Sequence, residues 1–164
     1  MNKETLRQQF DRCYDENGWF VAVRNAVEGI TAEQAAWRPD GADNSIWETL
    51  AHLNYYNNAY LVRFRDEDYE YKVASNDDTF AGSTEVSEDD WQDEIAKFDS
   101  VMDEWRGLLA AADESKFASP VRNKEDRNWG ELLADINAHN AYHGGQILLL
   151  RKLQGSWNSE DGVS

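Results

Sequence analysis

The sequence predicts an all-α protein, an antiparallel four-helix bundle in which one connection is a long crossover. Four long stretches repeat apolar residues every three or four positions, which is the period of a helix with one buried face. No stretch sustains the alternation of apolar and polar residues that is typical of a half-buried β-strand. The chain also contains only three histidines, and each of them falls inside a predicted helix.

The first predicted helix spans residues 4–28, and Gly18 interrupts it. Its apolar positions recur at steps of three, four or seven residues: Leu6, Phe10, Cys13, Phe20 and Val27. A short helical turn is expected to begin at Thr31, because Thr31-Ala32-Glu33-Gln34 matches the S/T-x-x-E/Q capping box. Pro39 and Gly41 then break the chain.

The second long helix is predicted to begin at Ser45, where Ser45-Ile46-Trp47-Glu48 forms another capping box. The apolar stripe that follows consists of Ile46, Leu50, Leu53, Asn57, Leu61 and Phe64. Residues 66–85 are acidic and long for a bundle connection. Because long ordered loops in compact domains are usually functional, we expect this segment near the opening of a site or at a subunit contact.

The third and fourth long helices are predicted to begin after Ser87 and at Asn128. The third carries Trp91, Ile95, Phe98, Met102, Trp105 and Leu109 at alternating steps of four and three. A loop of residues 113–127 contains Pro120, and the last helix then extends to about Leu153 and ends before Gly155. We therefore expect a single domain over residues 1–155 and a disordered tail over residues 156–164.

Composition restricts the class of protein. Hydrophobic residues make up 41% of the 164 residues and aromatic residues 12%, which is enough for a core without disulfides. No apolar run reaches the roughly 18 residues of a membrane span, and the first residues do not resemble a signal peptide. With one cysteine, Cys13, the expectation is a cytoplasmic protein. The formal charge of −16 argues against binding to nucleic acid.

Two histidines lie on the predicted buried face of the last helix. Leu132, Ile136, Ile147 and Leu150 define this face, and His139 and His143 fall in the middle of it. Four residues apart, the two rings lie one turn above each other and can converge on one ion. A single histidine on an apolar face is usually a core residue with hydrogen-bond partners. The pair of histidines is compatible with metal binding and with a purely structural role. If it binds a metal, its imidazoles suit zinc, nickel, copper and iron alike.

The remaining candidates lie near these rings. His52 sits at the flank of the stripe of the second long helix, where a modest rotation would aim it at the same point. Asp135 and Gln146 border the face of His139 and His143 and are candidates to orient their ring N–H groups, although both also fit as half-exposed boundary residues. Candidate acid–base residues are Glu48, one turn before His52, and Tyr56.

Three motifs in order along the chain use every histidine it contains. They are Trp37-Arg38-Pro39, then Ser45-Ile46-Trp47-Glu48-Thr49-Leu50-Ala51-His52-Leu53, then His139-Asn140-Ala141-Tyr142-His143-Gly144-Gly145-Gln146-Ile147 followed by Leu150-Arg151. With these motifs the chain resembles the DinB/YfiT-like superfamily over nearly its whole length. The pattern of that family is one histidine in the second helix and H-x-x-x-H-x-G-Q in the last. The sequence departs from it at Gly144, a position that is often basic.

The resemblance implies an antiparallel bundle with a long crossover, often dimeric, and a metal site formed by His52, His139 and His143 for zinc, nickel or a similar ion. Some members of the family transfer low-molecular-weight thiols such as bacillithiol or mycothiol to electrophiles, and many have no established activity. We therefore expect a divalent metal ion, a small-molecule substrate and a homodimer, with a low-molecular-weight thiol as a candidate second cofactor.

Two functions fit this sequence. One is a metal-dependent thiol-S-transferase or hydrolase, because three histidines leave coordination positions open, as they do in catalytic zinc sites. The other is a non-catalytic binding or interaction module whose metal is structural or absent. A fourth protein ligand would favour the second function. Cys13 lies on a core stripe and is interpreted as a packing residue.

Overall fold

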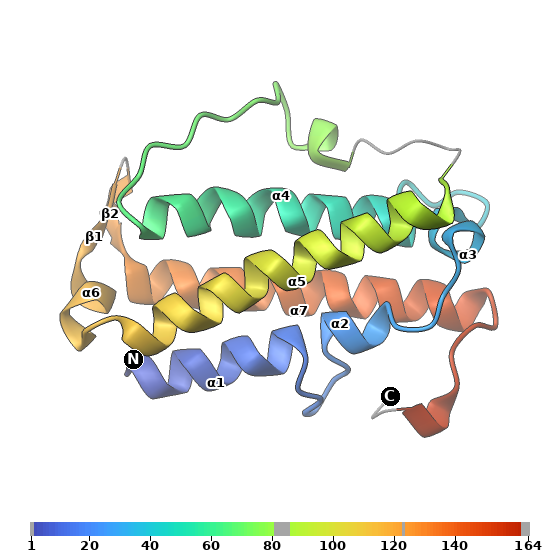
Figure 1. Ribbon diagram of the computed structural model, residues 1–164, viewed down its shortest axis with the longest axis horizontal. Coiled ribbons are helices and arrows are strands. Elements are labelled where there is room, and N and C mark those ends of the chain that lie inside the picture. Colours follow the sequence, from blue (N-terminus) through green and yellow to red (C-terminus); the bar gives the residue numbers. More distant parts are fainter. Residues whose placement is uncertain (1, 81–85, 123, 162–164) are drawn as a thin grey trace.

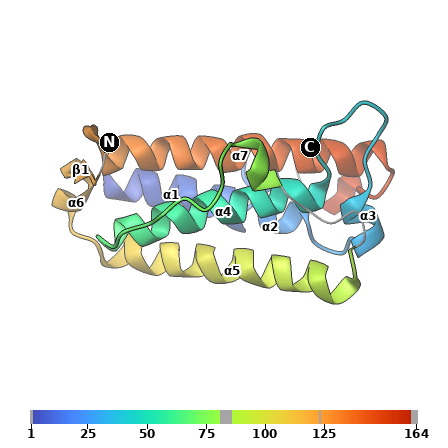
Figure 2. The same ribbon diagram turned by 90° about the horizontal axis from the view of Figure 1, so that it is seen from above.

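Four long helices form the body of the protein in a computed structural model that describes residues 2–80, 86–122 and 124–161. They are α1 (Lys3–Tyr14), α4 (Ile46–Phe64), α5 (Glu88–Ala111) and α7 (Trp129–Leu153). Helix α4 packs against α5 and α7, and α1 packs against the same two helices. The four helices therefore enclose one core (Figures 1 and 2), and the predicted four-helix bundle is confirmed.

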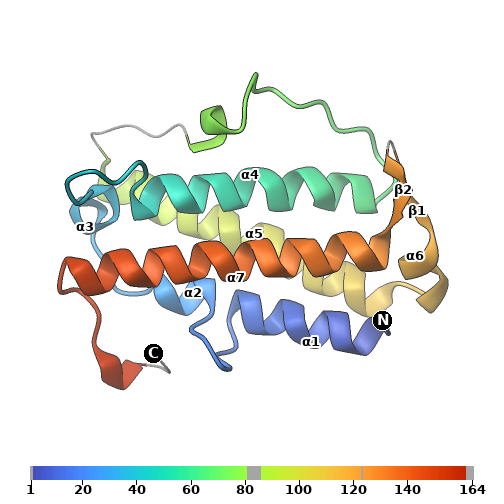
Figure 3. The same cartoon turned by 180° about the vertical axis from the view of Figure 1, so that it is seen from behind.

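The connection between α4 and α5 determines the directions of the helices. In Figure 1, α4 and α5 both run from right to left, whereas α1 and α7 run from left to right. The chain between α4 and α5 must therefore return to the other end of the bundle, and the first part of this connection that the structure describes, residues 65–80, arches over α4 (Figures 1 and 3). A 3-10 helix in this arch, η1 (Asp77–Phe80), contacts α4. The long crossover thus brings side chains from a distant segment onto α4.

Side-chain caps begin the helices where the sequence predicted them. Capping boxes form at Ser45 of α4, Ser87 of α5, Asn128 of α7 and Thr31 of the short helix α3 (Ala32–Ala36). In each, the cap side chain accepts from a backbone N–H of the first turn, an interaction that stabilises a helix by about 1 kcal/mol. These local signals explain why the helix starts could be read from the sequence.

The first helix is shorter than predicted. Helix α1 ends at Tyr14, and helical structure resumes only in α2 (Val23–Ala26). Between them the Asn17 side-chain oxygen accepts from the Ala22 N–H at 3.0 Å and from Asn25 Nδ2 at 2.8 Å. This turn replaces the helical hydrogen bonds that a continuous helix over residues 4–28 would need, so that prediction is corrected.

The predicted loop of residues 113–127 contains regular structure. It forms a short helix, α6 (Glu114–Ala118), and a hairpin of β1 (Pro120–Val121) and β2 (Lys124–Asn128). Every residue of β2 is polar, so this strand has no alternating pattern that a sequence analysis could detect. The expectation that residues 113–127 form only a loop is therefore corrected at this end of the bundle.

Packing of the chain continues beyond Gly155, where the sequence led us to expect a disordered tail. Arg151 donates from Nη2 to the Ser156 carbonyl at 2.7 Å, and its guanidinium lies 5.0 Å from the centre of the Trp157 ring. Trp157 packs against the core, and a 3-10 turn, η2 (Ser159–Asp161), follows. Residues 162–164 of the expected tail lie outside the described residues.

The core contains the large side chains that the helical periodicity placed there. Five of them are at most 6% exposed: Trp91, Phe98, Trp105, Ile136 and Ile147. Phe20, which was placed on the stripe of the first predicted helix, lies beyond the end of α1 and is 38% exposed. The indole N–H groups of Trp91 and Trp105 donate to the backbone carbonyls of Ile30 and Asn57, at 3.0 and 2.9 Å. Within the part of the chain that the structure describes, no helix is both long and apolar enough to cross a membrane.

Candidate metal centre

The three histidines come together between α4 and α7. His52 comes from α4, and His139 and His143 come from successive turns of α7. One nitrogen of each ring lies within 4.8 Å of the other two, and the Nε2 atoms of His52 and His139 are 2.9 Å apart. His52 and His143 are buried, and His139 is half-buried. The predicted three-histidine cluster is therefore confirmed.

A hydrogen bond to the crossover determines which nitrogen of His52 faces the cluster. The His52 Nδ1 atom lies 2.6 Å from the Thr79 hydroxyl, and this hydroxyl donates its single hydrogen to the Asn76 carbonyl, also at 2.6 Å. Thr79 must therefore accept a hydrogen from His52, so Nδ1 carries the proton of the neutral ring. The lone pair of Nε2 then points towards the other histidines.

Gln146 has the same effect on His143. Its amide nitrogen donates to the Tyr142 hydroxyl at 3.1 Å, and its carbonyl oxygen lies 2.6 Å from His143 Nδ1. Because a carbonyl oxygen only accepts, Nδ1 of His143 carries the proton and Nε2 has the free lone pair. Gln146 thus orients the ring, which is the contact that its position in the sequence suggested.

Burial keeps all three rings uncharged. It lowers the pKa of His52 to about 3, with a further contribution from His143 and His139, and it lowers the pKa of His139 to about 4. It also lowers the pKa of His143, whereas the hydrogen bond that this ring donates to Gln146 raises it. Neutral imidazole is the form that binds a metal ion, so these rings need no deprotonation near pH 7.

The cluster fits a metal ion. Two nitrogens held by one tetrahedral ion at 2.0–2.1 Å lie about 3.3 Å apart. The observed separations, 2.9 Å for one pair and no more than 4.8 Å for any pair, bracket this value. The two rings whose hydrogen bonds define a tautomer both aim an unprotonated Nε2 at the cluster. In geometry, charge and tautomer the three side chains therefore suit a divalent ion.

A buried amide pair holds α4 and α7 in register beside the cluster. Asn57 and Asn140 exchange two hydrogen bonds at 2.8 and 3.1 Å, and both are at most 1% exposed. Asn140 follows His139 directly in α7. In the sequence, Asn57 falls on an apolar stripe, and two asparagines 83 residues apart gave no sign of their pairing.

Aromatic rings surround His52. Phe80 of the crossover stacks on it with ring centres 3.9 Å apart and planes 12° apart, and Tyr56 meets it edge-on at 5.0 Å. Thr79 and Phe80 belong to the segment of residues 66–85, which was expected near the site opening. Its residues 76–80 do lie there, whereas its first residue, Asp66, pairs with Lys116 of α6, and residues 81–85 are outside the described chain. No sequence signal identified Thr79 or Phe80 individually.

The other candidate residues lie around the cluster but do not join it. Glu48 is buried, and its carboxylate accepts from the Ser45 N–H at 2.8 Å and pairs with Arg38. Asp135 forms an ion pair with Arg127 at 2.6 Å rather than orienting His139.

Tyr56 contacts both His52 and His139 through its ring, and its hydroxyl donates to Asn76 at 3.1 Å. Of the two candidate acid–base residues, the structure brings only Tyr56 to the histidines.

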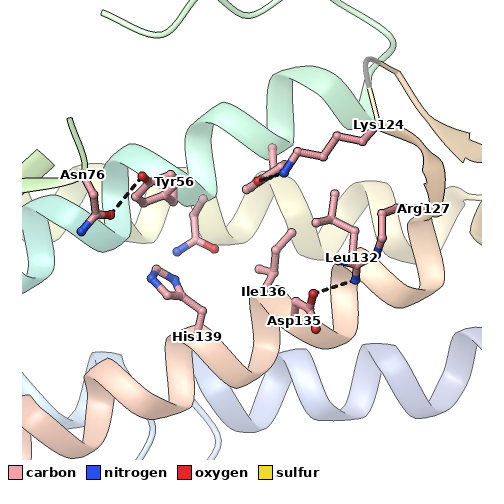
Figure 4. Close-up of a pocket in the computed structure, with 10 residues that line it drawn as sticks. Tyr56, Asn76, Lys124, Arg127, Leu132, Asp135, Ile136 and His139 are labelled. Carbon is pink, nitrogen blue, oxygen red and sulfur yellow. Dashed lines mark hydrogen bonds and ion pairs between the residues drawn. The ribbon is translucent and has the colours of Figure 1, made fainter. Parts of the chain in front are cut away.

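Two cavities adjoin the cluster. One, of about 390 Å³, exposes all three histidines together with Phe80, Tyr142 and Gln146. The other, of about 290 Å³, begins at Tyr56 and His139 and extends along α4 and α7 towards Lys124 (Figure 4). Among the described residues, no fourth histidine, cysteine or carboxylate belongs to the cluster. An ion bound here would keep coordination positions for another ligand.

Comparison with known proteins agrees with this geometry. The sequence pattern of the DinB superfamily matches residues 20–147, a range that includes all three histidines. Neither the curated proteins nor the solved structures gave a match. Because the matched range covers well over half of the 164 residues, the chain belongs to the DinB superfamily.

Proposed function

We propose that this protein is a metal-dependent enzyme that acts on a small molecule, as a thiol-S-transferase or a hydrolase. The observation that carries the proposal is a cluster of three neutral imidazoles that opens into cavities and has no fourth ligand among the described residues. Structural zinc sites are normally closed by four protein ligands, whereas catalytic sites have three and keep one position open. The same observation argues against a non-catalytic module with a structural metal.

His52, His139 and His143 would hold the ion, with zinc and nickel as the expected metals. A divalent ion in such a site lowers the pKa of a bound water or thiol, so that a nucleophile is available at neutral pH. Thr79 and Gln146 hold the protons of two imidazoles away from the cluster. Phe80 covers one face of His52 and keeps water from it.

Tyr56 is the best-placed side chain for proton transfer or hydrogen bonding to a substrate. Burial raises the pKa of its hydroxyl, so this group stays protonated at neutral pH and acts as a donor. It lines the cavity that begins at His139. Glu48 has no such role in the proposal, because Arg38 and the Ser45 N–H engage its carboxylate.

The two reactions differ in the nucleophile. In thiol transfer, the thiol gives its proton to solvent, its sulfur forms a bond to an electrophilic carbon, and the leaving group departs with its electron pair. In hydrolysis, water forms the new bond, and its proton goes to the leaving group. The apolar wall of the 290 Å³ cavity, which includes Leu132 and Ile136, favours an organic substrate in both cases.

Metal titration followed by an activity screen tests the proposal. Chelator-treated protein is titrated with zinc and with nickel, and His139→Ala and His143→Ala are compared with the wild type. We expect one ion per chain and a loss of affinity of at least tenfold in each variant. Cys13→Ala is the control, because this thiol is buried away from the cluster and burial raises its pKa to about 12.

The metal-loaded protein is then screened with thiols plus electrophiles and with ester and amide substrates. Turnover that is absent from His139→Ala would support an enzyme. Failure of the wild type to bind either ion would overturn the proposal, and tight binding without turnover in the screen would favour the non-catalytic module.

A further inference from the structure

The cavity beside His139 has a chemically distinct far end. Figure 4 shows it running between α4 and α7 from Tyr56 and His139 to Lys124 and Arg127. From His139 to Leu132 it follows α7 for seven residues, which is two helical turns or about 10 Å. Its walls between the two ends include Leu132, Ile136 and tyrosine rings, together with Asn57 and the ion-paired Asp135. The cavity therefore suits an elongated molecule with an apolar middle.

Lys124 supplies positive charge at this far end, and no described carboxylate pairs with it. Its Nζ atom donates to the Tyr60 hydroxyl at 3.1 Å and lies 5.4 Å from the centre of the Tyr60 ring. Within the described chain, Lys124 forms no ion pair. The other cation of the wall, Arg127, is neutralised by Asp135 at 2.6 Å. One of the two cations that line the cavity thus remains available to a ligand.

A buried arginine strengthens the positive field at the same place. Arg63 is only 7% exposed, and its guanidinium carbon lies 5.6 Å from the centre of the Tyr60 ring, the ring that Lys124 also contacts. Its Nε and Nη1 atoms are buried and have no hydrogen-bond partner among the described residues. Coulomb interactions are weakly screened in a protein interior, so a buried charge reaches further than an exposed one.

This concentration of positive charge stands out in an acidic protein. The chain has 32 acidic and 16 basic residues, and most of its described arginines pair with carboxylates. Lys124 and Arg63 both lie against Tyr60 without such a partner in the part of the chain described. Lys124 lines the cavity, and Arg63 does not line it but contacts the same Tyr60 ring. An anionic ligand beside Lys124 would stabilise these two cations.

We infer that the substrate carries an anionic group, a carboxylate or a phosphate, that binds to Lys124 beside Tyr60 while its reacting end lies at the three histidines. The position of the reacting end rests on the proposed function. The anion site itself rests only on Lys124, Tyr60 and Arg63. The site would then select substrates by their negative charge at one end of the cavity and by their reacting group at the histidines, two helical turns away.

Binding of simple probes tests the anion site without turnover. Calorimetry with full-length protein, both zinc-loaded and chelator-treated, compares hexanoate, hexyl phosphate and 1-hexanol, which share one alkyl chain. We expect one of the two anions to bind at least fivefold more tightly than the alcohol, with affinity falling as salt is raised. The ratio of hexanoate to hexyl phosphate identifies the anion that the site prefers.

Two matched variants locate the site. Lys124→Gln should weaken anion binding about tenfold, the loss expected for one charge-assisted hydrogen bond. Lys152→Gln removes the same charge from an exposed position at the end of α7 and should leave binding unchanged. Equal binding of hexanoate, hexyl phosphate and hexanol, or equal losses in the two variants, would overturn the inference.

A thiol probe separates this inference from the proposed function. 6-Mercaptohexanoate should bind zinc-loaded protein more tightly than hexanoate, because its sulfur reaches the histidines while its carboxylate stays at Lys124. If the thiol adds no affinity but Lys124→Gln still weakens both probes, the anion site stands and the metal-centred function fails. If the thiol adds affinity and Lys124→Gln changes nothing, the proposed function stands and the anion site is wrong.

Discussion

Asn57 and Asn140 exchange two hydrogen bonds across the buried interface of α4 and α7, from each amide nitrogen to the oxygen of the other. This pair connects the helix of His52 to the helix of His139 and His143. A slip of either helix would separate the rings and break the pair together. The amide pair therefore couples the stability of the bundle to the geometry of the candidate metal centre.

Replacing one member of the pair should damage both properties. Asn140→Leu leaves the Asn57 amide buried without its partner, which should cost about 1–3 kcal/mol of unfolding free energy and weaken zinc binding. Urea denaturation and zinc titration measure the two effects. In the double variant Asn57→Leu/Asn140→Leu no amide is left unpaired, so stability should largely recover. A single variant as stable as the wild type would show that the pair does not hold the helices.

The Thr79 hydroxyl should tune the affinity for metal. Thr79→Val keeps the shape of the side chain but removes the acceptor of His52 Nδ1, so the ring loses its fixed tautomer and orientation. Loss of such a contact typically weakens metal binding 10–100-fold. Competition with a zinc chelator measures the change, and Thr5→Val, at an exposed position in α1, is the matched control. Unchanged affinity in Thr79→Val would assign the hydroxyl a packing role only.

The buried histidines should make the metal-free protein less stable in mild acid. In the unfolded chain they titrate near 6.5, whereas burial lowers the folded pKa of His52 to about 3 and that of His139 to about 4. Between these values the unfolded state binds more protons, so unfolding free energy rises with pH and is fully present above about 6.5.

Each histidine contributes a slope of at most about 1.4 kcal/mol per pH unit. Urea denaturation from pH 4 to pH 7 should therefore show a shallower slope for His52→Asn than for the wild type. The carboxylates titrate alike in both proteins, so the difference isolates the histidine. Because burial lowers the pKa of these histidines, metal binding should also persist to a lower pH than it would in an exposed histidine cluster. Identical slopes would mean that His52 is not held neutral by burial.

Trp105 should be among the most stabilising residues of the core. It is fully buried, contacts the tilted ring of Phe64 with ring centres 5.1 Å apart, and donates its indole N–H to the Asn57 carbonyl. Trp105→Ala should cost about 3–5 kcal/mol in urea denaturation. Trp19→Ala is the control, because Trp19 is fully exposed and should change stability by less than about 0.5 kcal/mol. Similar losses in both would contradict the assigned core.

Local signals account for the parts of the fold that were predicted correctly. Capping boxes at Ser45, Ser87 and Asn128 act within one helical turn, so they work before any tertiary contact forms. The prediction failed where a turn competed with a helix, at Asn17, and where a strand carried only polar residues, in β2. There the outcome depended on contacts that helical periodicity does not encode.

The sequence by itself determined the four amphipathic helices, their starts, and the spacing that places His139 and His143 one turn apart, because periodicity and capping depend on neighbours along the chain. Only the tertiary structure decided which side chains complete the site. Thr79 contacts His52 although they are 27 residues apart in the sequence, and Lys124 contacts Tyr60 although they are 64 apart. Such contacts depend on how the helices and the crossover pack together, and no local pattern in the sequence specifies that packing.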